Sequence, residues 1–171
     1  MNVLDFAIEM ENDGFEYYKD LADSSTLPGL KTIFSSLAAD ELKHAKVFKA
    51  LNTGETVGKM PASETLETSK NLFKQLSGGS EELKNIADSL KAYQHAMKLE
   101  ANSFRFYEEV AEKETNPTVK ALLLQIAEEE HTHYNILENV YSFVNAPNQS
   151  LEWGEFSNLG EFRQFGRETD G

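Results

Sequence analysis

Two short motifs of the form Glu-x-x-His, Glu41 to His44 and Glu130 to His133, pair a carboxylate with an imidazole. Residues three apart share one face of a helix, so both side chains of each pair can reach one ligand. Oxygen and imidazole donors suit iron or manganese, and open coordination positions suit the reactions of Fe(II) with oxygen species. One such motif alone is common on solvated helix faces. Two copies on apolar faces, each preceded by a further Glu at 11 or 100, favour a metal site.

These residues belong to an internal repeat. Residues 7–51 pair with residues 96–140 without a gap, at a constant offset of 89. Eleven positions are identical: Ala7/Ala96, Glu11/Glu100, Phe15/Phe104, Tyr18/Tyr107, Ala22/Ala111, Thr26/Thr115, Pro28/Pro117, Lys31/Lys120, Ala38/Ala127, Glu41/Glu130 and His44/His133. Because the turn is matched as well as the flanking segments, the two halves are copies of one helical hairpin.

The candidate ligands lie among apolar residues. Leu37, Phe48 and Leu51 share the face of the first motif, and Ile126, Leu137 and Val140 share that of the second. Four buried, unpaired carboxylates would cost more than the net stability of a domain of this size. Two divalent ions would neutralise four carboxylates. The sequence therefore predicts a centre of two metal ions held by Glu11, Glu41, His44, Glu100, Glu130 and His133.

The spacing of apolar residues predicts an all-α protein, a four-helix bundle of two helical hairpins. We expect the first pair of helices to meet at a turn over 26–29, and Asn116-Pro117 to separate the second pair. Residues 54–80 contain Gly54, Gly58 and Pro61 and predict a long crossover with one short helix between 63 and 76. Ser80 is the expected cap of the third helix. Residues 1–145 form the expected bundle and 146–171 a tail of aromatic and Gly residues, which packs on the bundle or clamps a partner subunit.

At these motifs the chain resembles the rubrerythrin-type branch of the ferritin-like superfamily, over about residues 2–145. The resemblance implies a non-haem diiron centre, with Mn or Zn as possible substitutes for the two Fe ions. It implies that Glu41 and Glu130 bridge the metals, that Glu11 and His44 complete one site, and that Glu100 and His133 complete the other.

The chain departs from that family in two ways. Rubrerythrins carry a rubredoxin domain with four Cys ligands, and this sequence has no Cys. They also carry a carboxylate one turn after the position of Glu100, where this chain has Ser103, whose repeat equivalent is Gly14. We therefore expect a more symmetric site in which both His ligands stay engaged. The closer likeness is to short, single-domain proteins of the same type.

Several other polar residues lie close to these ligands in the sequence. Tyr18 and Tyr107 each lie seven residues after a candidate Glu, and we regard them as candidate catalytic residues whose hydroxyl groups hydrogen-bond ligand carboxylates; the alternative is that they are core aromatics. His95 and His131 have no His at the equivalent repeat position and are expected at the surface or rim. Glu128 and Glu129, which directly precede Glu130, are expected to face water.

Three functions fit the predicted centre. The first is an oxidoreductase that reduces hydrogen peroxide or dioxygen with electrons from an external donor such as a rubredoxin-like protein. The second is a ferroxidase or iron-handling protein. The third is a non-catalytic protein stabilised by two metal ions, whose aromatic tail binds a partner. We rank them in this order and expect a homodimer.

The composition limits the kinds of binding partner and the cell compartment that we expect. A formal net charge of −13 argues against nucleic acid and anionic membranes. The absence of Cys removes disulfides, zinc ribbons, iron–sulfur clusters and thiol nucleophiles. No apolar run approaches the roughly 20 residues of a membrane-spanning helix, and the first residues do not resemble a signal peptide. These features favour a cytoplasmic protein.

Overall fold

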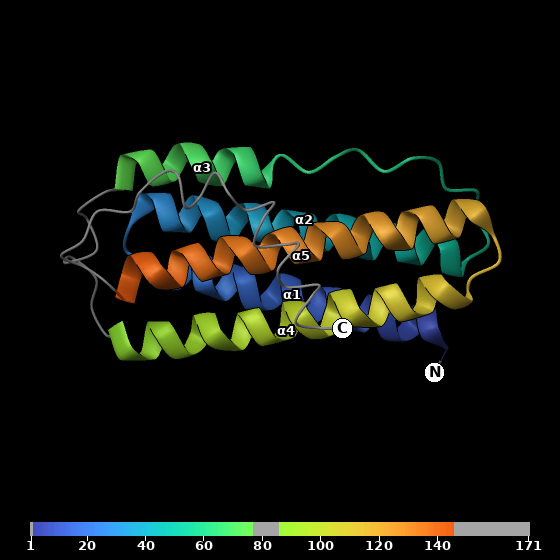
Figure 1. Ribbon diagram of the computed structural model, residues 1–171, viewed down its shortest axis with the longest axis horizontal. Helices are drawn as coiled ribbons and strands as arrows, with labels where there is room; N and C mark the ends of the chain where they lie inside the picture. Colours follow the sequence, from blue (N-terminus) through green and yellow to red (C-terminus); the bar gives the residue numbers. More distant parts are fainter. Residues whose placement is uncertain (1, 77–85, 146–171) are drawn as a thin grey trace.

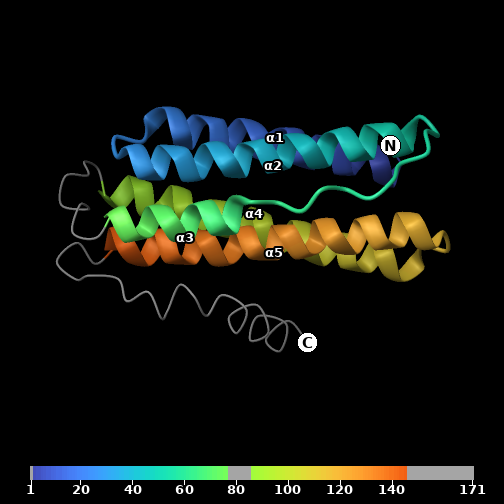
Figure 2. The same cartoon turned by 90° about the horizontal axis from the view of Figure 1, so that it is seen from above.

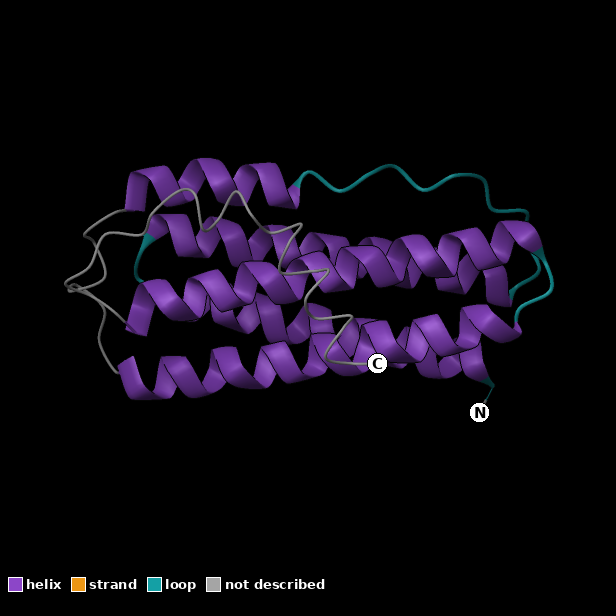
Figure 3. Ribbon diagram, viewed as in Figure 1, coloured by secondary structure: helices purple, strands orange, loops and turns teal. Residues whose placement is uncertain are grey.

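A computed structural model of the chain describes residues 2–76 and 86–145. Within these ranges it is all-helical, with helices α1 (Val3–Ser24), α2 (Pro28–Asn52), α3 (Thr65–Leu76), α4 (Ile86–Lys113) and α5 (Pro117–Asn145), and no strand. The four long helices lie side by side along one axis (Figures 1 and 3). The predicted fold class, a ferritin-like helical bundle, is confirmed. The expected cap Ser80 and the tail 146–171 lie outside the described residues.

Each pair of long helices is an antiparallel hairpin. Figure 2 shows α1 and α2 as one layer and α4 and α5 as the other. Pro28 and Pro117 are the first residues of α2 and α5, where a missing backbone N–H costs no helical hydrogen bond. The side chain of Asn116 accepts hydrogen bonds from the backbone N–H of Thr118 at 2.9 Å and of Val119 at 3.3 Å, and so caps α5. The predicted turns between the helices are therefore present.

The crossover between the hairpins begins after α2. Gly54 has a φ of +79°, a left-handed conformation that Gly adopts without strain. The chain then runs without regular structure to α3, which packs on α2 and α5 (Figures 1 and 2). Ser69 and Phe73 on α3 are buried. The short helix expected between 63 and 76 is thus present, and it covers one face of the bundle.

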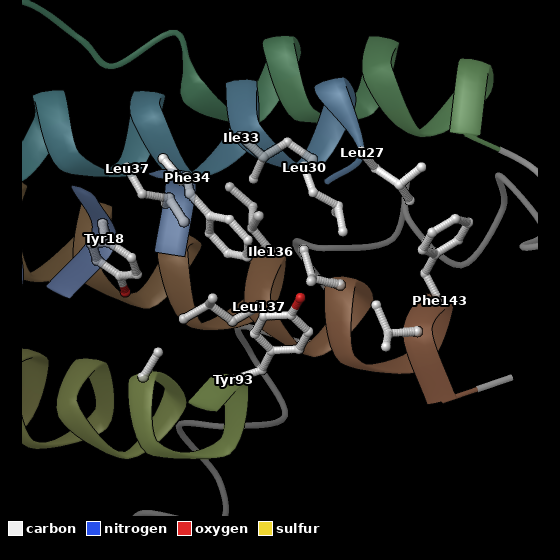
Figure 4. Close-up of a cluster of buried hydrophobic side chains, with 14 of the residues drawn as sticks. Tyr18, Leu27, Leu30, Ile33, Phe34, Leu37, Tyr93, Ile136, Leu137 and Phe143 are labelled. Atoms are coloured by element: carbon white, nitrogen blue, oxygen red, sulfur yellow. The ribbon is translucent and has the colours of Figure 1, made fainter. Parts of the chain in front are cut away.

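Two clusters of buried apolar side chains fill the bundle on either side of the candidate ligands. The first apolar cluster includes Leu30, Phe34, Leu37, Ile136 and Leu137 (Figure 4). The second includes Phe48, Phe104, Tyr107, Leu122 and Ile126. Burying a side chain of this kind contributes about 1.5–3 kcal/mol, so the two clusters hold the helices in register around the polar centre. No helix in the described part of the chain is long and apolar enough to cross a membrane.

Candidate metal centre

The bundle brings all six candidate ligands to its interior, where none is more than 3% exposed. Their donor atoms form two overlapping groups, and the atoms of each group lie within 4.8 Å of one another. One group is Glu11, Glu41, His44 and Glu130, and the other is Glu41, Glu100, Glu130 and His133. The two groups share Glu41 and Glu130. An arrangement with two shared carboxylates offers a pair of adjacent ions two bridging residues.

Each imidazole approaches the carboxylates of both hairpins. His44 Nδ1 lies 2.8 Å from Glu130 Oε1 and 3.5 Å from Glu11 Oε2. His133 Nδ1 lies 3.0 Å from Glu41 Oε1 and 3.3 Å from Glu100 Oε1. The two rings are nearly parallel, with centroids 6.2 Å apart. The site is therefore built across the interface between the hairpins rather than within either one.

Several of these donor atoms have no hydrogen-bond partner in the described structure, although they are buried. They are Glu11 Oε2, Glu41 Oε1, Glu100 Oε2, Glu130 Oε1 and His44 Nδ1. Buried polar atoms are normally paired, and unpaired acceptors of this kind are expensive. Atoms that lie close together without forming a hydrogen bond, such as His44 Nδ1 and Glu130 Oε1 at 2.8 Å, are the arrangement that a shared cation would stabilise. The residues present therefore fit a pair of metal ions.

The electrostatics of the centre also favour cations. Burial and the charges of Glu11 and Glu130 raise the pKa of Glu41 well above its usual value. Burial and the charges of Glu100 and Glu11 do the same to the pKa of Glu130. These carboxylates must hold protons or gain positive neighbours to be stable in this interior. Bound metal ions take the place of such protons.

The imidazoles respond in the opposite sense to burial. Burial by itself lowers the pKa of His44, but the charge of Glu11 and hydrogen bonds with carboxylates outweigh it and raise that pKa well above normal. Burial also opposes the charged form of His133, and the charge of Glu100 together with a hydrogen bond to Asp40 again raises its pKa. Both shifts report a concentration of negative charge around the rings.

The two candidate tyrosines are buried and reach across the bundle. Tyr107 on α4 donates a hydrogen bond of 2.8 Å to Glu11 on α1, and Tyr18 on α1 donates one to Glu100 on α4. Burial and the neighbouring carboxylate charges raise the pKa of both hydroxyl groups. The hydroxyls therefore stay protonated and serve as donors. Each orients one carboxylate of the opposite hairpin.

Two acids that sequence reasoning missed complete the surroundings of the imidazoles. His44 Nε2 lies 2.8 Å from Glu129 Oε1, and His133 Nε2 lies 2.8 Å from Asp40 Oδ2. The expectation that Glu129 faces water was wrong, because its carboxylate contacts His44 on α2 and the residue is only 8% exposed. Asp40 and Glu129 occupy equivalent positions of the repeat. They are both acidic but not identical, so they do not appear among the eleven identical pairs. A count of acids at equivalent positions would have found them.

The crossover makes the two halves of the centre unequal. Asp40 Oδ2 also accepts hydrogen bonds from Ser63 Oγ at 2.6 Å and from Thr65 Oγ1 at 2.7 Å. Burial raises the pKa of Asp40, but the hydrogen bond and charge of His133 and these hydroxyl groups lower it overall. Within the described residues, no hydroxyl group of the crossover bonds to Glu129, and Lys43 Nζ lies 3.5 Å from Glu129 against 3.9 Å from Asp40. The internal symmetry is therefore broken outside the six candidate ligands.

The two remaining histidines differ from each other. His95 is exposed, as expected, and its ring lies 5.3 Å from that of Tyr17. His131 was expected at the surface or rim, and this was wrong, because it is 1% exposed. Its ring lies against Phe104, with centroids 4.3 Å apart. His131 belongs to neither ligand group, so it is not one of the candidate ligands.

A cavity of about 370 Å³ between α1 and α4 reaches the centre from outside. We call it the α1–α4 cavity. Gly14 and Ser103, which are equivalent in the repeat, line its opposite walls, and Glu41 and Glu130 lie at its floor. A Cβ atom at Gly14 would lie 2.9 Å from Glu41 Oε2. The absence of a side chain at Gly14 therefore leaves room for the carboxylate of Glu41.

Comparison with protein families gives one result for most of the chain. The family model described as Rubrerythrin matches residues 2–141. This range contains all six candidate ligands, both tyrosines and the two acids next to the imidazoles. Neither the curated proteins nor the solved structures include a significant match.

Proposed function

Because the chain belongs to the rubrerythrin family, we propose that it is an oxidoreductase that reduces hydrogen peroxide at a centre of two iron ions. Proteins of this family are generally oxidoreductases that bind two irons. The observation that carries the proposal is the pair of overlapping buried ligand groups that share Glu41 and Glu130. Mn or Zn can occupy the same donors, but only a redox-active ion supports turnover.

We assign the ligands by the overlap of the two groups. Glu41 and Glu130 would be shared by the two ions, Glu11 and His44 would complete one site, and Glu100 and His133 would complete the other. Four carboxylates balance the charge of two divalent ions, which offsets the cost of burying either set of charges alone. This assignment is the one that the family resemblance implies, and the orphaned acceptor atoms support it.

These residues would hold two iron ions, which would supply electrons and Lewis acidity to peroxide. The rest of the work falls to the chain. Glu129 accepts a hydrogen bond from His44 Nε2, and Asp40 accepts one from His133 Nε2. The Nδ1 atom of each imidazole is then left facing the centre as a ligand atom. Tyr18 and Tyr107 hold the outer carboxylates in place. The two apolar clusters keep water out of the interior of the bundle on either side of the ligands.

The overall reaction consumes two electrons and two protons for each peroxide molecule, and yields two water molecules. The chain has no Cys and so cannot hold a rubredoxin-type iron site. We therefore assign the supply of electrons to an external donor such as a rubredoxin-like protein. Dioxygen is the alternative oxidant.

The decisive experiment combines metal analysis with rapid mixing. We expect two irons per chain, and we expect the reduced protein to react with peroxide much faster than free Fe(II) does. Glu41→Ala should lose both ions, whereas Glu11→Ala should lose one, because Glu41 belongs to both groups and Glu11 to one. A reaction with peroxide no faster than that of free Fe(II) would refute the peroxidase. In that case fast oxidation by dioxygen with iron retention would favour the ferroxidase, and folding that depends on metal without turnover would favour the structural role.

A further inference from the structure

The α1–α4 cavity offers more space than peroxide requires. Its volume of about 370 Å³ falls in the range of roughly 300–1,000 Å³ that small-molecule sites occupy. Hydrogen peroxide has only two heavy atoms. A cavity of this size next to the centre can hold an organic molecule of the size of one substituted ring.

The depth of burial of its lining residues defines a mouth and a floor. Phe6 and Leu99 are 44% and 36% exposed and stand at the mouth with Asp13 and Asn102, which are also exposed. Glu41 and Glu130 at the floor are 3% and 1% exposed. The cavity therefore leads from solvent to the two carboxylates that we assign as bridges.

The floor holds acceptors that nothing in the described chain satisfies. Glu41 Oε1 and Glu130 Oε1 are buried without a hydrogen-bond partner, and both residues line the cavity. The walls stay open beside them because Gly14 and Ser103 are small and lie opposite each other on α1 and α4. Both helices thus carry a small residue where the centre meets the cavity.

The walls and the charge indicate the class of ligand. Met10, Tyr17, Leu99 and Phe106 contribute an apolar and aromatic lining. Among the lining residues that the structure describes there is no Lys, Arg or His, whereas Asp13 carries a carboxylate at the mouth. When metal ions neutralise the floor, Asp13 remains as the charge that an entering molecule meets. This pattern favours a cationic head group on an apolar body.

We propose that the α1–α4 cavity binds a small organic cation, with its apolar body toward the dimetal centre and its positive head group beside Asp13. The inference rests on the proposed function, because the metal ions neutralise the carboxylates at the floor. It adds to that function a ligand class that is much larger than peroxide.

Benzylamine is a suitable probe, since it joins one ring to one ammonium group. Protein loaded with redox-inert Zn²⁺ would be titrated with benzylamine and followed by NMR, with the metal content measured in the same samples. We expect saturable binding and magnetisation transfer from the ring protons to the Met10 methyl group. Benzyl alcohol has the same body without the charge, and we expect it to bind about two- to fivefold more weakly, the usual range for an exposed ion pair.

Variants separate the cavity from other surfaces. Asp13→Asn should lower benzylamine affinity to that of benzyl alcohol and leave benzyl alcohol binding unchanged. Asn102→Trp should block the mouth and weaken both probes at least about tenfold, as expected when apolar contact area is lost. If Asn102→Trp does not fold, Ser103→Leu fills the cavity from one wall. Leu124→Trp is the matched control, because Leu124 is 45% exposed on α5 and does not line the cavity.

The possible failures are distinguishable. A protein that contains no metal after reconstitution refutes the proposed function and the inference together. A metal-loaded protein that does not bind benzylamine, or whose binding survives both Asp13→Asn and Asn102→Trp, refutes the inference alone. Tighter binding of benzoate than of benzylamine would show that the metals rather than Asp13 select the ligand, and would overturn the proposed ligand class.

Discussion

The carboxylates behind the two imidazoles offer the sharpest test of the centre. Asp40→Asn keeps the shape of the side chain but removes the negative charge 2.8 Å from His133 Nε2. Glu129→Gln makes the equivalent change 2.8 Å from His44 Nε2. Because each acid contacts one imidazole, we expect each variant to weaken the metal ion bound by its own His and to leave the other ion nearly unaffected.

The magnitude follows from the contacts of each acid. Replacing the partner of a metal-bound His typically lowers metal affinity about 10- to 100-fold, which corresponds to roughly 1.4–2.8 kcal/mol. Asp40 is fixed by Ser63 and Thr65 in addition to His133, so its charge is held in one position. Lys43 lies closer to Glu129 than to Asp40, at 3.5 Å against 3.9 Å, and offsets part of the Glu129 charge. We therefore expect Asp40→Asn near the upper end of the range and Glu129→Gln near the lower end.

The assay is a calorimetric titration with Zn²⁺ in competition with a chelator, which resolves two dissociation constants. NMR signals of the imidazole rings identify which site each constant describes. Glu16→Gln is the charge-matched control, since Glu16 is exposed on α1. Equal weakening of both sites by either variant, or a change of less than about threefold for Asp40→Asn, would refute the reasoning.

Three further predictions concern the same centre. Gly14→Ala should stabilise helix α1 by about 0.5–1 kcal/mol, yet lower metal affinity, because the new Cβ would lie 2.9 Å from Glu41 Oε2. Thermal melts of the metal-free protein measure the first effect and metal titrations measure the second. An unchanged metal affinity would contradict the close contact. Tyr107→Phe should leave the metal content unchanged but slow the reaction with peroxide, because Glu11 loses its donor at 2.8 Å; equal rates in a stopped-flow comparison would remove Tyr107 from the mechanism. Zn²⁺ at 100 times its dissociation constant should raise the free energy of unfolding by about 2.7 kcal/mol for each independent site, and an unchanged denaturation midpoint would argue against binding to the folded state.

The local order of the chain explains why the bundle could be predicted. Apolar residues at three- and four-residue spacing determine which face of a helix is buried, whatever packs against it. The offset of 89 residues then shows that one hairpin occurs twice, with the same turn and the same polar residues inside. Glu11, Glu41, His44 and their equivalents could thus be placed in the interior before any contact between helices was known.

The tertiary structure decided how the two hairpins meet, and with it the partner of each side chain. His44 approaches Glu130 and Tyr107 donates to Glu11, and both contacts join residues of different hairpins. The burial of His131 against Phe104 and of Glu129 against His44 likewise depends on the packing between helices. Helical periodicity carries no information about the relative rotation and register of two helices, because these follow from the fit of whole faces.

The sequence by itself therefore determined the helices, the repeat and the set of ligand-type side chains that must be buried together. Only the tertiary structure decided that Ser63 and Thr65 of the crossover hold Asp40, whereas no hydroxyl group of the described crossover holds its equivalent, Glu129. The reason is that a duplicated hairpin is symmetric in sequence, whereas a single connection can cover only one side of the bundle that two hairpins form.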